Sequence, residues 1–417
     1  GAAFVLIYLF FLAILGLPIM VMEFAVGRAS QKSIATSFNV LEKKGSKWHV
    51  YRYFGMAGNY LLMMFYTTIG GWMLQYFFKM AGDFVGLNAE QISRVFGEVS
   101  TSKNSMIFWM FVIVVLGFLV CSLGLQNGVE KITKVMMVVL LALMLVLAVR
   151  SCTLDGASEG LKFYLLPDFK KLTEYNVTEV VFAAMGQAFF TLSLGIGALA
   201  IFGSYIGKER KLTGEAISIT ILDTFVAIVA GLIIFPACFA FGVDPGEGPG
   251  LVFVTLPNVF NAMAGGRIWG TFFFLFMTFA ALSTIIAVFQ NIIAFAQDLW
   301  GWNLKKASFV NMIAVFVLSL PCIFGMTIWS DFTILGKDIM GFEDFLVSNN
   351  LLPLGSLVYL MFCVSRYGWG WDNFLKEANT GAGISFPKKI RFYLNYILPL
   401  IVLYIFFQGY WSLFQSL

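Results

Sequence analysis

The sequence predicts an all-α membrane protein with about ten transmembrane helices. Charged residues make up 12% of the 417 residues, about half of the roughly 25% found in an ordinary soluble domain. Hydrophobic residues make up 59%, and the mean hydropathy is +0.85. Ten apolar runs are long enough to cross about 30 Å of hydrocarbon, which takes about 20 helical residues. Membrane lipid is therefore the solvent that the chain requires, and a soluble multidomain enzyme is excluded.

The ten runs follow one another without a Ser/Pro-rich linker or a low-complexity tract, so we expect one transmembrane domain over residues 1–417. Nearly all charged residues lie between the runs. The expected spans lie near 1–22, 55–80, 106–125, 132–150, 178–205, 216–242, 268–297, 308–328, 346–366 and 392–413.

Alternate loops hold most of the basic residues. Eighteen of the 27 Lys and Arg lie in one set of loops, and such loops face the cytoplasm. This places both ends of the chain outside the cell. The start, an apolar run without a basic region or cleavage site, is not a signal peptide, and an outside start leads us to expect one further span upstream. The basic loops are 23–54, 126–135, 206–215, 298–307 and 366–391.

Cysteine and histidine are too few and too scattered for most metal or catalytic sites. The five cysteines are widely spaced, and His49 is the only histidine. A zinc site, a Ser-His-Asp triad and a HExxH helix are therefore excluded. Paired catalytic aspartates are also absent, so no enzyme is expected. The net charge of +4 is explained by the basic loops and does not indicate a nucleic-acid partner.

The run 178–205 is interrupted by polar and small residues. These are Gln187, Thr191, Ser193, Gly195, Gly197 and Gly203. One interpretation is tight helix packing through small side chains. The other is a discontinuous helix, whose freed backbone groups must line a cavity because lipid cannot satisfy them.

Asp223 lies in the next apolar run. A carboxylate at the centre of a membrane helix costs about 2.5 to 3.5 kcal/mol, so it should face a cation, a proton pathway or water. The alternative is an interfacial residue that caps the helix.

Ala280, Ser283 and Thr284 share one face of the run 268–297, because their spacing is i, i+3, i+4. Two hydroxyls and a carbonyl could supply part of a cation's oxygen shell. Alternatively, both hydroxyls bond back to the preceding helical turn.

Two further polar residues are ambiguous on their own. Tyr66, in FYTTIGGW, is typical of packing or interface tyrosines. Glu23 ends the first span, where it could extend to the inner interface or anchor a turn through loop N–H groups.

Three strings together resemble the neurotransmitter:sodium symporter family, especially its bacterial amino-acid transporters of the tyrosine type. They are GAAFVLIYLFFLAILGLPIMVMEFAVGR, GQAFFTLSLGIGALAIFGSY and AALSTIIAVFQNIIAFAQD, in that order. The resemblance implies a LeuT-type inverted-repeat bundle comprising the family's spans two to eleven, with a helix broken near 190–198. It also implies sodium-coupled amino-acid import by alternating access in the bacterial inner (plasma) membrane, with two sodium ions and no organic cofactor.

The resemblance also assigns residues to sites. The implied substrate positions are Tyr66, Phe190, Thr191, Ser193, Ile196, Thr284 and Val288. The implied first sodium site contains Thr191 and Asp223, and the second contains Ala280, Ser283 and Thr284. The implied cytoplasmic gate is Asp298 with Ser204 and Tyr205, and the outer gate is Asp344, whose Arg partner belongs to the upstream span. The positions that match the family's anion site are Tyr8, Gln187 and Asp223.

Two departures from the family pattern carry predictions. Chloride-dependent members have Asn at the position of Asp223, so the carboxylate is expected to replace the chloride charge and to make transport chloride-independent. The leucine-type relative has Phe at the position of Ile196, so we expect room for a larger side chain and favour tyrosine or another aromatic amino acid.

Two other classes stay open at this stage. A channel would show a continuous polar lining, and a non-transporting membrane scaffold protein would use polar residues only for packing. The sequence makes no prediction of the oligomeric state.

Overall fold

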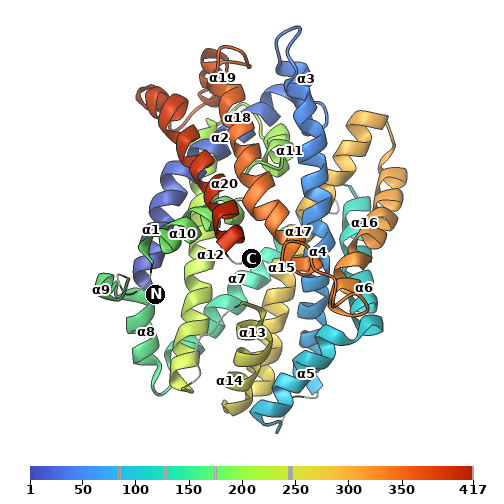
Figure 1. Cartoon of the computed structure of the whole chain (residues 1–417), viewed down its shortest axis with the longest axis vertical. Coiled ribbons are helices and arrows are strands. Elements are labelled where there is room, and N and C mark those ends of the chain that lie inside the picture. The colour runs from blue at the N-terminus through green and yellow to red at the C-terminus, as the bar shows by residue number, and fades with distance from the viewer. Residues whose placement is uncertain are drawn as a thin grey trace.

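The computed structural model describes all residues except 83, 85, 125–128, 173, 175, 243–247 and 416–417, and the side chain of residue 171. The described part is almost entirely helical (Figure 1). Its β-structure is limited to two isolated bridges, Arg210 with Ala382 and Ile334 with Lys337. The predicted all-α class is therefore confirmed.

Eight helical segments of the described residues are long and apolar enough to cross a membrane. Four are single helices: α6 (Lys103–Ser122), α7 (Lys131–Cys152), α12 (Leu212–Ala240) and α16 (Leu304–Met326). A fifth is α15 (Gly266–Trp300). Three are composite and contain a π-helical turn: α1 (Ala2–Phe11), η1 (Leu12–Gly16) and α2 (Leu17–Ser30); α17 (Ile339–Phe345), η5 (Leu346–Leu351) and α18 (Leu352–Val364); and η6 (Lys388–Ile390), η7 (Tyr393–Ile397) and α20 (Leu398–Gln415).

Two more segments match the remaining predicted runs. These are α4 (Tyr51–Gly82) and the pair α10 (Val177–Thr191) and α11 (Ala198–Tyr205). The helix ends differ from the predicted ones by a few residues, most of all at the first span, which continues to Ser30 instead of ending near 22. The apolar runs mark only the part of each helix that lies in the hydrocarbon core. The helices themselves continue beyond that core, so their ends are predicted less well.

Short helices between the spans were not predicted. They are α3 (Ser37–Leu41), η2 (Trp48–Val50), α5 (Ala89–Thr101), α8 (Ala157–Leu165), α9 (Phe169–Leu172), α13 (Gly248–Gly250), η4 (Leu251–Thr255), α14 (Leu256–Ala262) and α19 (Trp371–Ala378). They are too short or too polar to register as apolar runs. A capping box formed by Asn88 and Gln91, for example, starts the amphipathic helix α5.

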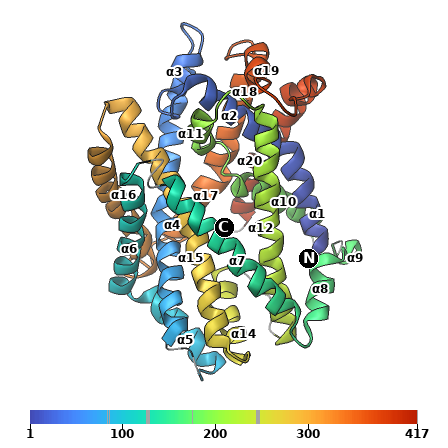
Figure 2. The same ribbon diagram turned by 180° about the vertical axis from the view of Figure 1, so that it is seen from behind.

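The two ends of the bundle differ in the loops they carry (Figures 1 and 2). Helices α3, α11 and α19 lie at one end, and α5, α8 and α14 lie at the other. The first end carries the Lys- and Arg-rich loops 23–54, 206–215 and 366–391. Within the bundle, α4 packs along α15, and α2 packs along α11. These two pairs position the site described below.

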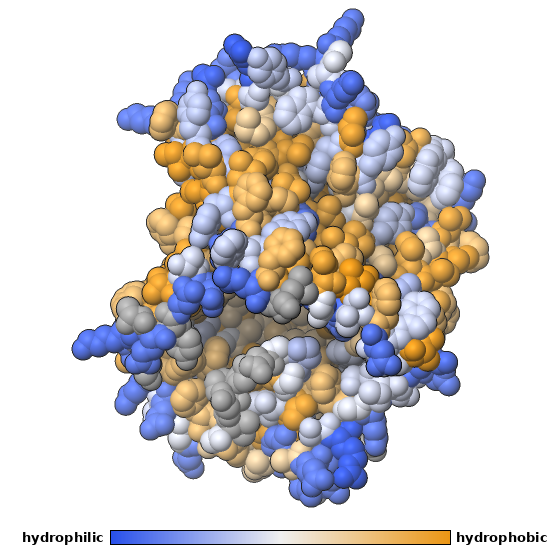
Figure 3. All heavy atoms as spheres, in the orientation of Figure 1, coloured by the Kyte–Doolittle hydropathy of each residue, from blue (hydrophilic) through white to orange (hydrophobic). Residues whose placement is uncertain are grey.

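The outer surface is that of an integral membrane protein. Large apolar side chains such as Ile221, Leu400 and Phe407 are more than 60% exposed. Figure 3 shows apolar residues over much of the middle of one face, with hydrophilic residues at both ends and around a hollow. Such a surface requires contact with lipid.

Candidate binding site at a broken helix

The helix predicted over 178–205 is discontinuous. α10 ends at Thr191, α11 begins at Ala198, and the six residues between them are not helical. Ser193, Gly195 and Gly197 have φ values of 50°, 87° and 78°. This left-handed region is open to glycine but strained for Ser193. The structure thus selects the discontinuous helix over the tightly packed continuous one.

Glu23, on α2, binds backbone groups at the break. Its side chain is fully buried. It accepts hydrogen bonds from the N–H groups of Gly195 (3.0 Å) and Leu199 (3.2 Å). Leu199 lies in the first turn of α11, where N–H groups have no partner within the helix. The alternative that Glu23 extends to the inner interface is therefore wrong, and the residue anchors the break.

Side chains from α4 satisfy the freed carbonyl groups. The Tyr51 hydroxyl donates to the carbonyl of Gly195, and the Asn59 amide donates to that of Ile196 (2.7 Å). Asn59 in turn accepts a hydrogen bond from Asn291 on α15 (2.8 Å). Buried backbone polar groups need such partners, so the break is a built feature of the fold.

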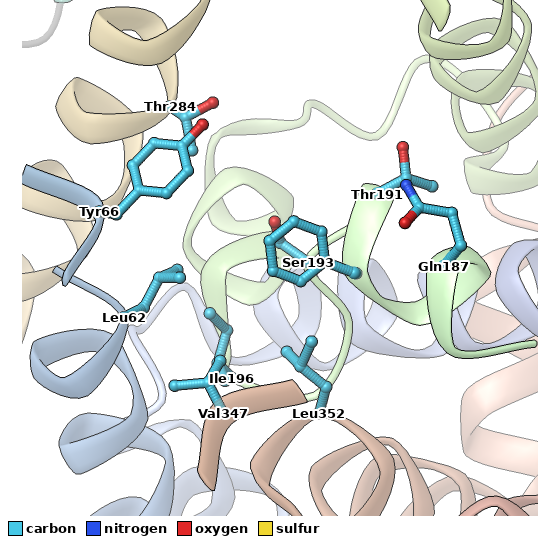
Figure 4. Close-up of a pocket in the computed structure, with 10 residues that line it drawn as sticks. Leu62, Tyr66, Gln187, Thr191, Ser193, Ile196, Thr284, Val347 and Leu352 are labelled. Atoms are coloured by element: carbon cyan, nitrogen blue, oxygen red, sulfur yellow. The ribbon is translucent and has the colours of Figure 1, made fainter. Parts of the chain in front are cut away.

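A pocket of about 220 Å³ opens beside the break (Figure 4). Tyr66 and Thr284 lie on one side of it, Thr191 and Gln187 lie on the other, and Ser193 lies between them. Its lining consists of Leu62, Tyr66, Gln187, Phe190, Thr191, Ser193, Ile196, Thr284, Val347 and Leu352. Six of the seven predicted substrate positions are thus brought together. The seventh, Val288, is buried one turn beyond Thr284 on α15 and is outside this lining.

Asp223 faces the end of α10 and is half-buried on α12. It accepts a hydrogen bond from the Thr191 hydroxyl (2.9 Å), and Tyr8 on α1 also interacts with Thr191. Gln187 lies one turn before Thr191 on α10. Among the ion pairs of the described residues, none involves Asp223. A carboxylate in this setting without a protein cation is suited to bind a small cation.

The three oxygen groups predicted on α15 lie together, but they bond to one another. The carbonyl of Ala280 accepts from the hydroxyls of Ser283 (2.8 Å) and Thr284 (3.4 Å). This is the back-bonding that was the alternative interpretation. Thr284 also interacts with Tyr66. The second cation site therefore remains a prediction, with its three oxygens in one place.

The predicted gate residues lie on different elements and are held by different partners. Asp298 accepts from the backbone N–H of Ser33 (2.7 Å) and pairs with Lys32 (3.4 Å). Tyr205 lies near Asp298, while the Ser204 hydroxyl donates to its own helix. The outer residue, Asp344, is exposed and accepts from the Ser348 hydroxyl (2.8 Å).

Comparison with known proteins places this geometry in a family. The sodium:neurotransmitter symporter family matches residues 79–416. An uncharacterised sodium-dependent transporter of Bacillus subtilis, YhdH, is 35% identical over 97% of this chain and 89% of its own length. An uncharacterised sodium-dependent transporter of Haemophilus influenzae is 31% identical over 98% and 90%. The crystal structure of MhsT in complex with L-phenylalanine superposes with a TM-score of 0.88 at 36% identity, covering 98% of this chain and 92% of that one.

These relatives are transporters and not enzymes, and the fold is that of a LeuT-type transporter. The broken helix, the pocket beside it and the likeness over nearly the whole chain lead to one conclusion. The chain belongs to the sodium:neurotransmitter symporter family and is a sodium-dependent membrane transporter.

Proposed function

We propose that the protein imports a hydrophobic or aromatic amino acid, with tyrosine as the first candidate, together with two sodium ions by alternating access. The observation that carries this proposal is the pocket at the broken helix, where polar groups adjoin an apolar wall. The likeness to MhsT, whose structure contains L-phenylalanine, supports the substrate class. The protein would act in the bacterial plasma membrane with its C-terminus outside.

The two parts of the pocket suit the two parts of an amino acid. The Tyr66 hydroxyl would donate a hydrogen bond to the substrate carboxylate. The apolar wall, formed by Leu62, Ile196, Val347 and Leu352, would accept the side chain. Wall residues come from α4, the broken segment, η5 and α18, so substrate binding would draw several elements together.

Thr191 would couple sodium to the substrate. It lines the pocket and also donates to Asp223, so a cation held by these two residues would fix one wall of the pocket. Ala280, Ser283 and Thr284 would hold the second ion once the hydroxyls turn away from the Ala280 carbonyl. Coupling of this kind is reciprocal: each ligand raises the affinity of the other by the same factor.

Transport would not need chloride, because Asp223 would supply the negative charge beside the first sodium ion. We expect uptake by the wild type to be unchanged when chloride is replaced by gluconate. The Asp223→Asn variant should bind sodium more weakly, and chloride should restore part of the loss. A strict chloride requirement in the wild type would contradict the assignment.

The test of the substrate is sodium-dependent binding of radiolabelled tyrosine to the purified protein, with phenylalanine, tryptophan and leucine as competitors. Binding should be strong in sodium and weak in potassium. Tyr66→Phe should weaken it by about 1 to 3 kcal/mol through loss of a hydrogen bond to a charged group. Tyr396→Phe, at an exposed tyrosine, is the matched control. If none of the four amino acids binds, the proposed substrate class is wrong.

A further inference from the structure

A second buried acidic side chain lies away from the pocket. Glu343 is on α17 and is only 3% exposed. α17 packs against α4 and α16. Neither carboxyl oxygen has a hydrogen-bond partner, and no ion pair of the described residues includes Glu343. Buried acidic side chains normally have hydrogen-bond partners. Glu23, for example, accepts hydrogen bonds from two backbone N–H groups.

The described groups that act on the Glu343 carboxyl include no positive charge. α16 contributes the Cys322 thiol, which adjoins the carboxyl without forming a well-aligned hydrogen bond. Thr68 on α4 interacts with Cys322, and its hydroxyl is also buried without a hydrogen-bond partner. The charged group that interacts electrostatically with Glu343 is Asp338, which caps the start of α17 and is itself acidic.

These neighbours decide what the carboxyl can bind. An ionised carboxylate is unstable when it is buried without a cation, and a nearby acidic group adds repulsion. A hard metal cation needs about six oxygen ligands, but the neighbours supply one hydroxyl and a soft sulfur atom. A proton needs only one carboxyl oxygen and removes the charge.

We propose that Glu343 is a proton-binding site. Its carboxyl binds one proton while α17 is seated on α4 and α16, and it releases the proton when α17 moves away and water reaches the group. The proton is distinct from the sodium ions and substrate of the proposed function.

Glu343 and part of the pocket wall belong to one continuous helical segment. α17 continues through η5 into α18, and Val347 on η5 and Leu352 on α18 line the pocket. The neighbouring Asp344 is exposed, so Glu343 is the acidic residue of this pair that faces the protein interior. Seating of α17 therefore positions one wall of the pocket, and proton binding at Glu343 favours the conformation that forms it.

The direct test is infrared difference spectroscopy of the purified wild type in H₂O and D₂O, compared with Glu343→Gln. We expect a protonated carboxyl band in the wild type at neutral pH that is absent from Glu343→Gln. Glu98→Gln, which changes an exposed glutamate on α5, should keep the band. If the wild type and Glu343→Gln give the same carboxyl bands, Glu343 is ionised and the proposal is wrong.

The second test measures coupling to the pocket. Sodium-dependent amino-acid binding by the wild type should weaken in alkali, with a limiting slope of about tenfold per pH unit for one proton. Glu343→Gln, which resembles the protonated form, should lose this dependence, and Glu98→Gln should keep it. An unaltered alkaline loss in Glu343→Gln would overturn the coupling. The infrared test does not depend on the amino acid, so failure of the proposed substrate and failure of the proton site are distinguishable.

Discussion

Replacing Glu23 by Gln should weaken the binding of sodium and substrate together. The substitution keeps the shape of the side chain and one acceptor oxygen. The other oxygen becomes an NH₂ group, which faces the N–H of either Gly195 or Leu199 and cannot accept from it. One of the two hydrogen bonds that Glu23 accepts at the break is therefore lost.

The size of the effect follows from those two contacts. Removing the acceptor of a buried hydrogen bond leaves an N–H group without a partner, which costs about 1 to 3 kcal/mol. Part of this loss falls on overall stability and part on the organised segment. We therefore expect both affinities to fall by about 10- to 100-fold, since about 1.4 kcal/mol is tenfold.

The assay is radioligand binding to purified protein at several sodium concentrations, with thermal melting measured in parallel. Glu130→Gln, which changes an exposed glutamate, is the control and should behave as the wild type does. The reasoning is refuted if Glu23→Gln folds and keeps both affinities. It is also refuted if the affinity for only one of the two ligands falls, because both are argued to use the same segment.

Three further predictions concern the break, the loop that contains Glu42 and the pocket. At Gly195, where φ is 87° and an added Cβ would meet the backbone of α18, substitution by Ala should abolish sodium-dependent binding, whereas Gly186→Ala, with open space around it, should not. Burial raises the pKa of Glu42, but hydrogen bonds from neighbours that include His49 outweigh it, so its pKa lies below the ordinary value. Glu42→Gln should therefore lower the melting temperature above about pH 4, with the difference from wild type lost as the pH falls through the pKa of the folded state. Ile196→Phe should shift selectivity from aromatic towards smaller amino acids by about 1 to 3 kcal/mol in competition binding; unchanged selectivity would contradict the pocket assignment.

Features with a local signal could be predicted from the sequence. An apolar run of membrane-spanning length is such a signal, and each of the ten predicted runs coincides with a helix or a helical segment of the described residues. The break in the run 178–205 was also visible, because Gly195 and Gly197 two residues apart weaken a helix without forming one packing face. Asp223 was identified because its carboxylate is expensive in lipid.

Features that depend on tertiary contacts could not be predicted. Leu62, Val347 and Leu352 line the pocket, but apolar residues in a membrane helix look the same whether they face lipid, protein or a cavity. Glu343 and Asp344 are adjacent acidic residues with the same local signal. Successive helical residues point about 100° apart, so only the packing of α17 shows that the first is buried and the second is exposed.

The broken segment joins two groups of helices that are held in different ways. α11 lies against α2 with backbone in contact, since a Cβ on Gly27 would overlap the carbonyl of Ala200. These two helices therefore move together. α4 is tied to α15 by close packing and by the Asn59–Asn291 hydrogen bond. It donates hydrogen bonds to the segment from Tyr51 and Asn59. Motion between the two groups would stretch those two hydrogen bonds to backbone carbonyls. Under the proposed function, ligands that order the segment would oppose this motion, so binding at the pocket would control opening of the bundle.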